Sequence, residues 1–476
     1  MRRKYLLILA FVIVACSGRS QTPDGTPSSR FERLYVPQNH SQIVVYARAL
    51  TPISLPLTWK IRKVALNRAD GSQVEVPNSE TSLSLSGIVG GQKLLLVSDA
   101  DAGDFSGISI FTDDVISEVD GKSVPTDSKI VTIDHSFTIV PGNTKTLNVL
   151  VDWKYAGDMR KDVQLEPEFS IEEETPSRAR RLIYVSNEGS SNISVIDRDS
   201  KRVIHNVFVG TKPFALAADR RRKRLYIADR EDGVLYEMDM VGSQLTRAIE
   251  IEFVDEPVHI EPVPSEDVYL VLNYGSHRVY IMDSFTSEII ETIDVPEQPI
   301  DAVYSPYYDR VFVLCQRWGM LAALDVSKRP VVVDTTFRVE QQPMGLAIDD
   351  TAEWLFISNS GSIDFTVFEI RRMAVERTIP IGTGAGDVVF DPSSRRLYIG
   401  MIDTREILCL DPFTGVMVFR TSLPTRPGKM YFEAEEKKLY VTLPKSNAVA
   451  VVDPISHKIS HWIETGIGPT SVTAGL

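Results

Sequence analysis

Hydrophobic and polar positions in the second part of the chain alternate in short β-type runs, and the pattern recurs every 42 or 44 residues. Each repeat contains an apolar run, a polar or Gly-rich turn, and a second apolar run that ends in an acidic residue. The acidic residues are Asp197, Asp239, Asp283, Asp325, Glu369, Asp411 and Asp453. A period of this length indicates a repeat architecture.

Two further strands are predicted in each repeat. After the acidic residue come an alternating strand, a turn and a short strand that usually opens at a proline. The openings are Pro213, Pro257, Pro299, Pro343, Pro427 and Pro469, with Ala385 in the remaining place. Four short antiparallel strands per repeat predict a β-propeller blade, because such a sheet buries its faces only against neighbouring sheets.

The two ends of the repeat region are complementary. The region starts at a second strand near Arg181 and ends with a first strand, Pro469 to Leu476. The C-terminal strand is therefore expected to complete the first sheet and to close the ring, which removes an open edge. The pattern predicts a seven-bladed β-propeller over residues 180–476.

The region before the repeats has a different texture. Residues 30–165 contain short alternating runs separated by turns such as Ala69-Asp70-Gly71, and they show no helical period of useful length. This pattern predicts an all-β sandwich of the size of one domain. Residues 166–179 include three successive glutamates, Glu172 to Glu174, and are predicted to be an acidic linker.

The N-terminus carries a targeting signal. A basic start precedes an apolar run, Tyr5 to Ala15, that is too short to span a bilayer comfortably, so residues 1–15 are predicted to be a signal peptide. The run ends in Ile13-Val14-Ala15-Cys16, which resembles the lipobox of bacterial lipoproteins. That resemblance implies lipidation of Cys16, with acyl chains such as palmitate. Residues 16–29 are rich in Gly, Pro and Ser and are expected to form a flexible tether.

Ser17 follows the cysteine. By the sorting pattern of enteric lipoproteins, it favours the outer membrane of a bacterial cell envelope, on its periplasmic or outer surface.

Several repeat sequences also resemble a known family. The strand Ile183 to Asn187 (IYVSN), the ending Ser194 to Asp197 (SVID), and the dipeptides Val209-Gly210 and Ile381-Gly382 are similar to those of the YVTN-type, YncE-like seven-bladed propellers. The resemblance covers about residues 181–476. It implies a secreted or surface-attached binding or scaffold protein, although related propellers include lactonases and haem or copper enzymes.

The N-terminal domain is more loosely similar to a bacterial lipoprotein sandwich family without an assigned function. The similarity rests on segments such as Asp70-Gly71-Ser72, Lys93 to Leu96 and Asp120-Gly121-Lys122. It implies a fold and a cell-surface setting, and no chemistry.

The first strand of each blade should line a central channel. Two positions after the proline place, the repeats carry Ala215, His259, Asp301, Gly345, Asp387, Lys429 and Ser471. The residue after each of these is apolar, so the first set is expected to face the channel. The ligand candidates are His259, Asp301, Asp387, Lys429 and Ser471.

The channel allows three interpretations. It holds water and its polar groups satisfy one another, or it binds a small polar or anionic molecule with Lys429 and His259 as donors, or it holds a catalytic metal ion. The last would require ligands from several blades.

A docking surface is predicted at the loops that join second to third strands, since aromatic and arginine side chains are enriched in binding hot spots. The residues are Tyr274, His277, Arg317, Trp318, Met401 and Arg405. The alternative is that these are scattered exposed residues, which are ordinary.

Charge and composition exclude several classes of function. A net charge of -13 disfavours a nucleic-acid partner. The basic run Arg220 to Arg224 is interpreted as a solvated turn, with contact to anionic lipid or polysaccharide as the alternative. Cys315 and Cys409 are expected to be small buried hydrophobes.

No cofactor is predicted. The sequence contains no C-x-x-C-H string, and its seven histidines are too few and too scattered to indicate a copper cluster. Asp99, Asp101 and Asp104 are weak calcium candidates, because their spacing does not provide the full ligand set of a calcium loop.

Together these features predict a lipid-anchored, non-enzymatic envelope protein whose propeller binds a protein, peptide or glycan partner or serves as a scaffold. The alternative is a metal-dependent, lactonase-like hydrolase acting at the channel mouth. A third hypothesis is a structural component of a cell-surface assembly. The sequence leaves the oligomeric state open.

Overall fold

A computed structural model of the chain describes residues 41–50, 57–77, 81–84, 91–113, 115–117, 123–124, 129–156, 164–173, 181–251, 256–349 and 351–475. The predicted signal peptide (1–15), the tether (16–29) and the lipidation site Cys16 lie outside these residues. Among the described residues strands dominate, and two short 3₁₀ helices, η2 (Glu188–Ser190) and η3 (Pro444–Ser446), accompany them. None of the helices in the described part has the length and apolar character needed to cross a membrane.

The N-terminal region contains two sheets. The first has the order β11-β10-β1-β5 and consists of β1 (Ser41–Ala49), β5 (Lys93–Ala100), β10 (Thr144–Ala156) and β11 (Gln164–Glu172). The second has β2 at its centre and consists of β2 (Leu57–Arg68), β3 (Gln73–Val76), β4 (Thr81–Ser84), β6 (Gly103–Thr112), β7 (Val115–Ser117), β8 (Ser123–Val124) and β9 (Ile130–Ile139). Ile43, Trp59, Ile108 and Val149 are buried in one hydrophobic core that both sheets share.

The first part of the predicted linker lies in a strand. Residues 164–172 form β11, which pairs antiparallel with β10 and places Ser170 opposite Leu150. The prediction that a linker starts at Glu166 is therefore wrong, because Phe169 and Ile171 pack against the hydrophobic core and draw this acidic segment into the sheet. Residues 174–179 lie outside the described residues.

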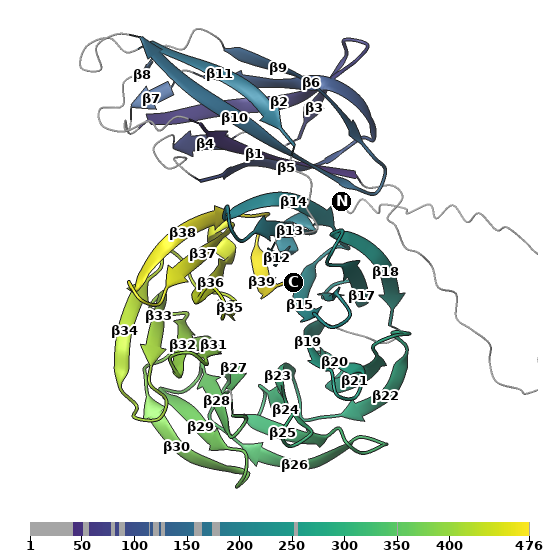
Figure 1. Cartoon of the computed structure of the whole chain (residues 1–476), viewed down its shortest axis with the longest axis vertical. Helices are drawn as coiled ribbons and strands as arrows, with labels where there is room; N and C mark the ends of the chain where they lie inside the picture. The colour runs from purple at the N-terminus through teal and green to yellow at the C-terminus, as the bar shows by residue number, and fades with distance from the viewer. Residues whose placement is uncertain are drawn as a thin grey trace, which may run out of the picture. The chain divides into compact units, whose positions relative to one another are not determined.

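From residue 182 onward, the described strands form four-stranded antiparallel sheets arranged around a centre (Figure 1). The first sheet contains β12 (Leu182–Asn187), β13 (Asn192–Asp197), β14 (Arg202–Phe208) and the C-terminal β39 (Pro469–Ala474). The next three contain β15 (Pro213–Asp219), β16 (Arg224–Asp229), β17 (Val234–Asp239), β18 (Gln244–Glu250), β19 (Pro257–Val263), β20 (Val268–Asn273), β21 (Arg278–Asp283), β22 (Ile289–Asp294), β23 (Pro299–Ser305), β24 (Arg310–Cys315), β25 (Met320–Asp325) and β26 (Val332–Arg338).

The last three contain β27 (Pro343–Ile348), β28 (Trp354–Asn359), β29 (Asp364–Glu369), β30 (Ala374–Pro380), β31 (Ala385–Asp391), β32 (Arg396–Met401), β33 (Glu406–Leu410), β34 (Met417–Ser422), β35 (Met430–Glu433), β36 (Lys438–Leu443), β37 (Ala448–Asp453) and β38 (Lys458–Glu464). In the first sheet β39 lies innermost, and in each of the other sheets the strand that comes first along the chain lies innermost (Figure 1). The predicted β-propeller is confirmed.

The repeated acidic residue ends the third strand and caps the turn that follows it. The Asp283 carboxylate accepts hydrogen bonds from the backbone N–H groups of Phe285 and Thr286, both at 2.8 Å. Those hydrogen bonds, the one from Thr286 first, lower the pKa of Asp283. Comparable turn hydrogen bonds follow Asp411 and Asp453. The most regular feature of the sequence is thus a turn that local hydrogen bonding stabilises.

Each sheet of the ring carries a register shift between its two outermost strands. Examples lie between Val195 and Ile196 and between Val451 and Val452. A bulge adds local twist to a strand. Because the shift recurs at the same place, each outer strand takes a similar bend.

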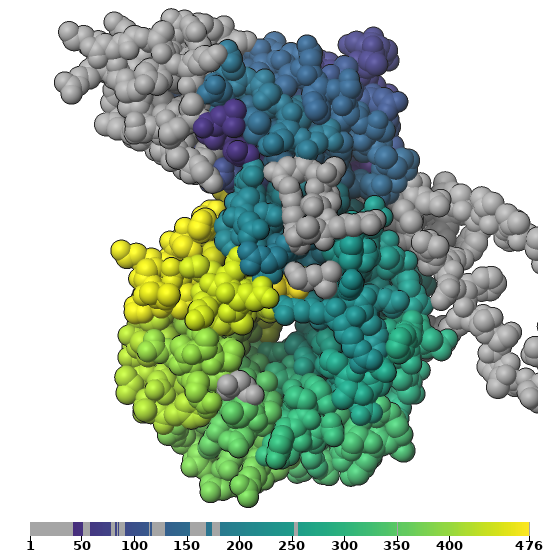
Figure 2. All heavy atoms as spheres, viewed as in Figure 1, coloured from purple at the N-terminus to yellow at the C-terminus, as the bar shows by residue number. Residues whose placement is uncertain are grey.

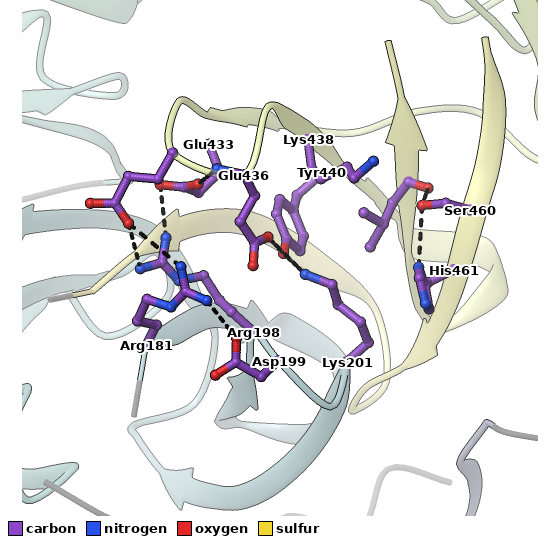
Figure 3. A network of polar contacts seen from close by, with 12 residues as sticks. Arg181, Arg198, Asp199, Lys201, Glu433, Glu436, Lys438, Tyr440, Ser460 and His461 are labelled. Carbon is purple, nitrogen blue, oxygen red and sulfur yellow. Dashed lines mark hydrogen bonds and ion pairs between the residues drawn. The ribbon is translucent and has the colours of Figure 1, made fainter. Parts of the chain in front are cut away.

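The last strand joins the first sheet, and β39 pairs antiparallel with β12 through partners such as Val472 opposite Val185. A polar network at the seam between this sheet and the last one adds to that closure (Figure 3). The Arg198 guanidinium pairs with Glu433 at 2.7 Å, and their side chains are only 3% and 4% exposed. Lys201 donates to Glu436 at 2.7 Å and to the Tyr440 hydroxyl at 2.8 Å.

The outer strand of the first sheet, β14, is covered by residues of the N-terminal region. Residues 34–476 form one compact unit, within which Val44 and Tyr46 of β1 share a buried core with Val203 of β14. The Val203 backbone N–H donates to the Gln92 side chain at 2.8 Å. By contrast, nearly every residue of β30 is exposed.

Two smaller predictions concern the propeller cysteines and the basic run Arg220 to Arg224. Cys315 and Cys409 are buried and unpaired with each other, as expected for small hydrophobes. The basic run is largely neutralised within the propeller, since Arg222 pairs with Asp219 at 2.8 Å and Arg221 with Asp267 at 3.2 Å.

Candidate functional site

Local backbone geometry sets the side chains at the ring centre. In β19 and β23 the register shifts between the opening proline and the second residue after it, which is His259 or Asp301. A bulge re-aims the side chain at the irregular position. The next residues along the strands, Ile260 and Ala302, are 3% and 1% exposed and pack in hydrophobic cores. The strand alternation that the sequence suggested therefore holds here.

Four of the five predicted channel residues meet in one charged network. The Lys429 ammonium group donates to Asp301 Oδ2 and to Asp387 Oδ1, each at 2.8 Å. His259 Nδ1 lies 3.0 Å from Asp301 Oδ1, and its Nε2 lies 3.4 Å from Glu261 Oε2. We call these five residues the channel network.

Backbone groups complete the hydrogen bonding of the two aspartates. The Met430 N–H donates to Asp387 Oδ2 at 2.7 Å, and the Leu346 N–H donates to Asp301 Oδ2 at 3.2 Å. Both oxygens of Asp387 thus accept a hydrogen bond, as the ionised form requires. These hydrogen bonds hold the two aspartates in fixed positions.

One contact of the network, between Lys429 and Asp301, joins sheets that are not neighbours in the ring. Lys429 directly precedes β35, whereas Asp301 lies on β23 and Asp387 on β31 (Figure 1). His259 and Asp301 lie on neighbouring sheets, and so do Asp387 and Lys429. The long Lys429 side chain joins these two pairs into one network.

Gly345 makes this convergence possible. It lies on β27, between the sheets that carry Asp301 and Asp387. A Cβ atom at Gly345 would lie 3.0 Å from the Asp387 Cα and equally close to the Gly386 oxygen and the Val388 nitrogen. Because these are main-chain atoms, they cannot rotate away. The missing side chain therefore allows β27 and β31 to approach closely.

Mutual contacts shift the pKa values within the network. Burial alone would lower the pKa of His259, but the charge of Asp301 and hydrogen bonds to Asp301 and Glu261 raise it to about 9. Burial raises the pKa of Asp387 above its ordinary value. For Asp301, Lys429 and His259 outweigh burial and hold its pKa well below its usual range.

The Lys429 pKa is raised, because its two carboxylate partners outweigh the effect of burial. At neutral pH the network therefore holds two cations, Lys429 and His259. Figure 2 shows an opening at the centre of the ring. The side chains of Lys429, His259 and Glu261 are 33%, 19% and 20% exposed, whereas those of Asp301 and Asp387 are 5% and 9% exposed.

Ser471, the fifth candidate, lies on β39 outside the network. Its backbone N–H donates to the Ser186 hydroxyl at 3.0 Å. Conversely, sequence reasoning missed Glu261, which accepts from the Tyr304 N–H at 2.7 Å as well as contacting His259. The signal was its position two residues after His259, since alternate residues of a strand share a face.

The predicted docking residues occupy different environments. Trp318 is 61% exposed, and the Arg317 guanidinium lies over its ring at 5.5 Å. Arg405 is exposed. Met401 is only 1% exposed, so its place on an exposed face is a wrong prediction, since it packs within a hydrophobic core.

Tyr274 and His277 have local structural contacts. The Tyr274 hydroxyl lies 3.5 Å from the Gln316 side chain, and its ring packs partly against a hydrophobic core. The His277 Nδ1 atom accepts from the Gln298 N–H at 3.2 Å, and the His277 backbone has a φ of 60°. His277 therefore shapes its loop.

Two of the three acidic calcium candidates have separate partners. Asp101 pairs with Arg68 at 3.6 Å, and Asp104 accepts from Thr138 at 2.7 Å. Across the described ranges, no three His, Cys, Asp or Glu side chains, these or others, are grouped so as to hold a metal ion.

Comparison with known proteins supports the fold alone. No family model matches the chain, and no curated protein matches it. Among solved structures, a hydrazine synthase from Kuenenia stuttgartiensis is similar with a TM-score of 0.52 and 16% identity, over 58% of this chain and 93% of that one. A putative 6-phosphogluconolactonase from Bacteroides uniformis gives a TM-score of 0.53 and 13% identity, over 62% and 99%.

A third structure, the dihydro-heme d1 dehydrogenase NirN in complex with DHE, gives a TM-score of 0.49 and 15% identity. The alignment covers 62% of this chain, which spans 65% of the length of that one. Identities this low leave the function to be argued from the site.

Proposed function

We propose that this chain is a lipid-anchored protein of the bacterial cell envelope that acts by binding, or as a scaffold, rather than by catalysis. In this proposal Cys16 carries the lipid, residues 16–29 form the tether, and the outer membrane is the site of attachment. The repeat region is a seven-bladed propeller of the YncE-like type, and the N-terminal region is a β-sandwich. The partner binds at the channel mouth.

One observation carries the proposal that the site binds without catalysis. The Lys429 ammonium group lies 2.8 Å from both Asp301 and Asp387. A metal ion bridging these carboxylates would need the same position, and a hydrolytic metal also needs an open coordination site. Lys429 therefore supplies the positive charge itself, so that a ligand would meet preorganised polar groups.

The main alternative is a metal-dependent, lactonase-like hydrolase. The structural similarity to the putative lactonase concerns the fold, and the network offers one histidine with two aspartates that are already paired to Lys429. Elemental analysis of the full chain and an assay with a panel of lactones test this alternative. We expect no stoichiometric metal and no turnover. Turnover that disappears in Asp387→Asn, with bound zinc or calcium, would overturn the proposal.

The anchor requires its own test. Mass spectrometry of the mature protein should find acyl chains on Cys16, and membrane fractionation should place the protein in the outer membrane. We expect Cys16→Ser to release the protein into the soluble fraction. A Cys16→Ser variant that stays with the membrane contradicts the lipid anchor and leaves the channel proposal intact.

A further inference from the structure

We propose that the channel network binds hydroxyl groups of a neutral carbohydrate. This inference rests on the proposed binding function and names its ligand class. It follows from the charge balance, from the polar atoms that remain accessible, and from an aromatic residue at the same end of the ring.

The charge balance disfavours an ionic ligand. Lys429 and His259 contact three carboxylates, those of Asp301, Asp387 and Glu261, at distances of 2.8 to 3.4 Å. An anion that approached either cation would also approach these carboxylates, and a cation that approached Glu261 would meet His259. In a partly desolvated channel each of these repulsions is costly. A neutral hydroxyl group encounters neither.

The accessible atoms suit hydroxyl groups in number and kind. An ammonium group has three N–H donors, and within the described residues Lys429 directs two of them at Asp301 and Asp387, which leaves one for a ligand oxygen. A carboxylate offers about four acceptor sites, so Glu261 can accept a further hydrogen bond in addition to those from Tyr304 and His259. One sugar hydroxyl can accept from Lys429 while a neighbouring hydroxyl donates to Glu261.

Shared contacts hold the two ligand-facing groups, Lys429 and Glu261, in place. Lys429 and His259 contact the two oxygens of the same Asp301 carboxylate, at 2.8 and 3.0 Å. Both ring nitrogens of His259 face carboxylates, so His259 orients Glu261 and does not itself donate to the ligand. Burial fixes Asp301 between the two cations.

An aromatic residue occupies the same end of the ring. Cys315 at the end of β24 pairs with Pro299 at the start of β23, two residues before Asp301. The loop that follows Cys315 carries Trp318, which is 61% exposed. An indole presents an apolar face for the C–H groups of a sugar, while its partner Arg317 lies over the ring at 5.5 Å.

The test uses the full chain in detergent and three matched sets of sugars. Each of glucose, galactose and mannose is compared with its uronate, which adds a negative charge, and with its 2-amino derivative, which adds a positive charge. Binding is measured by saturation-transfer NMR and calorimetry. We expect at least one neutral sugar to bind, with its charged derivatives at least ten-fold weaker.

Two variants locate the site. Lys429→Met and, because that variant could fold less well, Glu261→Gln should each weaken the neutral sugar at least ten-fold. Lys445→Met is the matched control, since Lys445 is exposed in η3 of the same sheet. A charged derivative that binds as tightly as its neutral parent would overturn the inference, as would binding that survives Lys429→Met and Glu261→Gln.

The failure of this inference can be told apart from the failure of the proposed function. If no sugar in the sets binds, the carbohydrate inference is wrong, whereas the binding function fails only if metal-dependent turnover is found in the separate assay.

Discussion

Two charged networks hold the propeller together, and they differ in what they leave exposed. At the seam, Arg198 and Glu433 pair at 2.7 Å with side chains 3% and 4% exposed (Figure 3). In the channel, Lys429 pairs with Asp301 and Asp387 at 2.8 Å, yet a third of its side chain is exposed. The seam joins neighbouring sheets, whereas the channel network joins sheets farther apart in the ring.

This comparison separates a network that only stabilises the fold from one that can also bind a ligand. A buried ion pair contributes only while both partners are present, because either one alone is left charged in a medium of low dielectric. An ion pair at the wall of an opening can also hydrogen-bond to a ligand. We therefore expect changes at the seam to alter stability alone, and changes in the channel to alter both stability and binding.

The largest effect is expected at the seam. Arg198→Met leaves the buried Glu433 without its cation and should lower the free energy of unfolding by about 3–5 kcal/mol. Urea denaturation of the full chain measures this loss. Arg181→Met is the control, because Arg181 is 46% exposed and should matter little. Equal losses in the two variants would contradict the structural role given to the buried pair.

The next effect depends on pH. The His259 pKa is raised from 6.5 to about 9, so its contribution to stability is complete below pH 6.5 and is lost as the pH rises through 9. A shift of this size corresponds to about 3 kcal/mol. The difference in unfolding free energy between the wild type and His259→Gln should therefore shrink from pH 6.5 to pH 9.5. A constant difference would show that His259 is not protonated in the network.

Removal of the central cation should have a somewhat smaller effect. Lys429→Met leaves Asp301 with His259 and Asp387 with the Met430 N–H. The loss for a buried pair is reduced here by solvent, since Lys429 is 33% exposed, and about 2–3 kcal/mol is expected. Urea denaturation alongside the exposed-site variant Lys445→Met measures this. An unchanged midpoint would mean that the network does not brace the ring.

The smallest effect concerns space rather than charge. Gly345→Ala places a Cβ atom 3.0 Å from main-chain atoms of β31, and overpacking of this kind should cost about 1–2 kcal/mol. Because the change also moves Asp387 relative to Lys429, we expect sugar binding to weaken. Gly415→Ala, where the nearest atom is at 3.7 Å, is a control for space, although its φ of 77° adds local backbone strain. Loss of stability without any change in sugar binding would show that Gly345 does not set the geometry of the binding site.

Much of the fold could be predicted because it depends on local chemistry. The acidic residue that revealed the repeat, such as Asp283, caps a turn through hydrogen bonds to residues two and three positions later. Such contacts leave a regular trace in the sequence. The end of the N-terminal region, where the acidic linker was predicted to start, was predicted less well. Phe169 and Ile171 extend a strand into this acidic segment because they pack against distant residues.

The candidate site was predicted in part. Strand alternation identified His259, Asp301, Asp387 and Lys429, because residues at equivalent positions of equivalent strands face the same way. It gave no means to find that Met401 is buried, which depends on how neighbouring sheets pack.

The sequence by itself determined the repeat, the strand order within it, and the polar residues of the innermost strands, because each follows from periodicity and turn chemistry within about 45 residues of chain. Only the tertiary structure decided that Lys429 contacts Asp301, which is 128 residues away. The distance across the ring, the gap left by Gly345 and the length of one lysine side chain together determine that contact. None of these is a property of any single repeat.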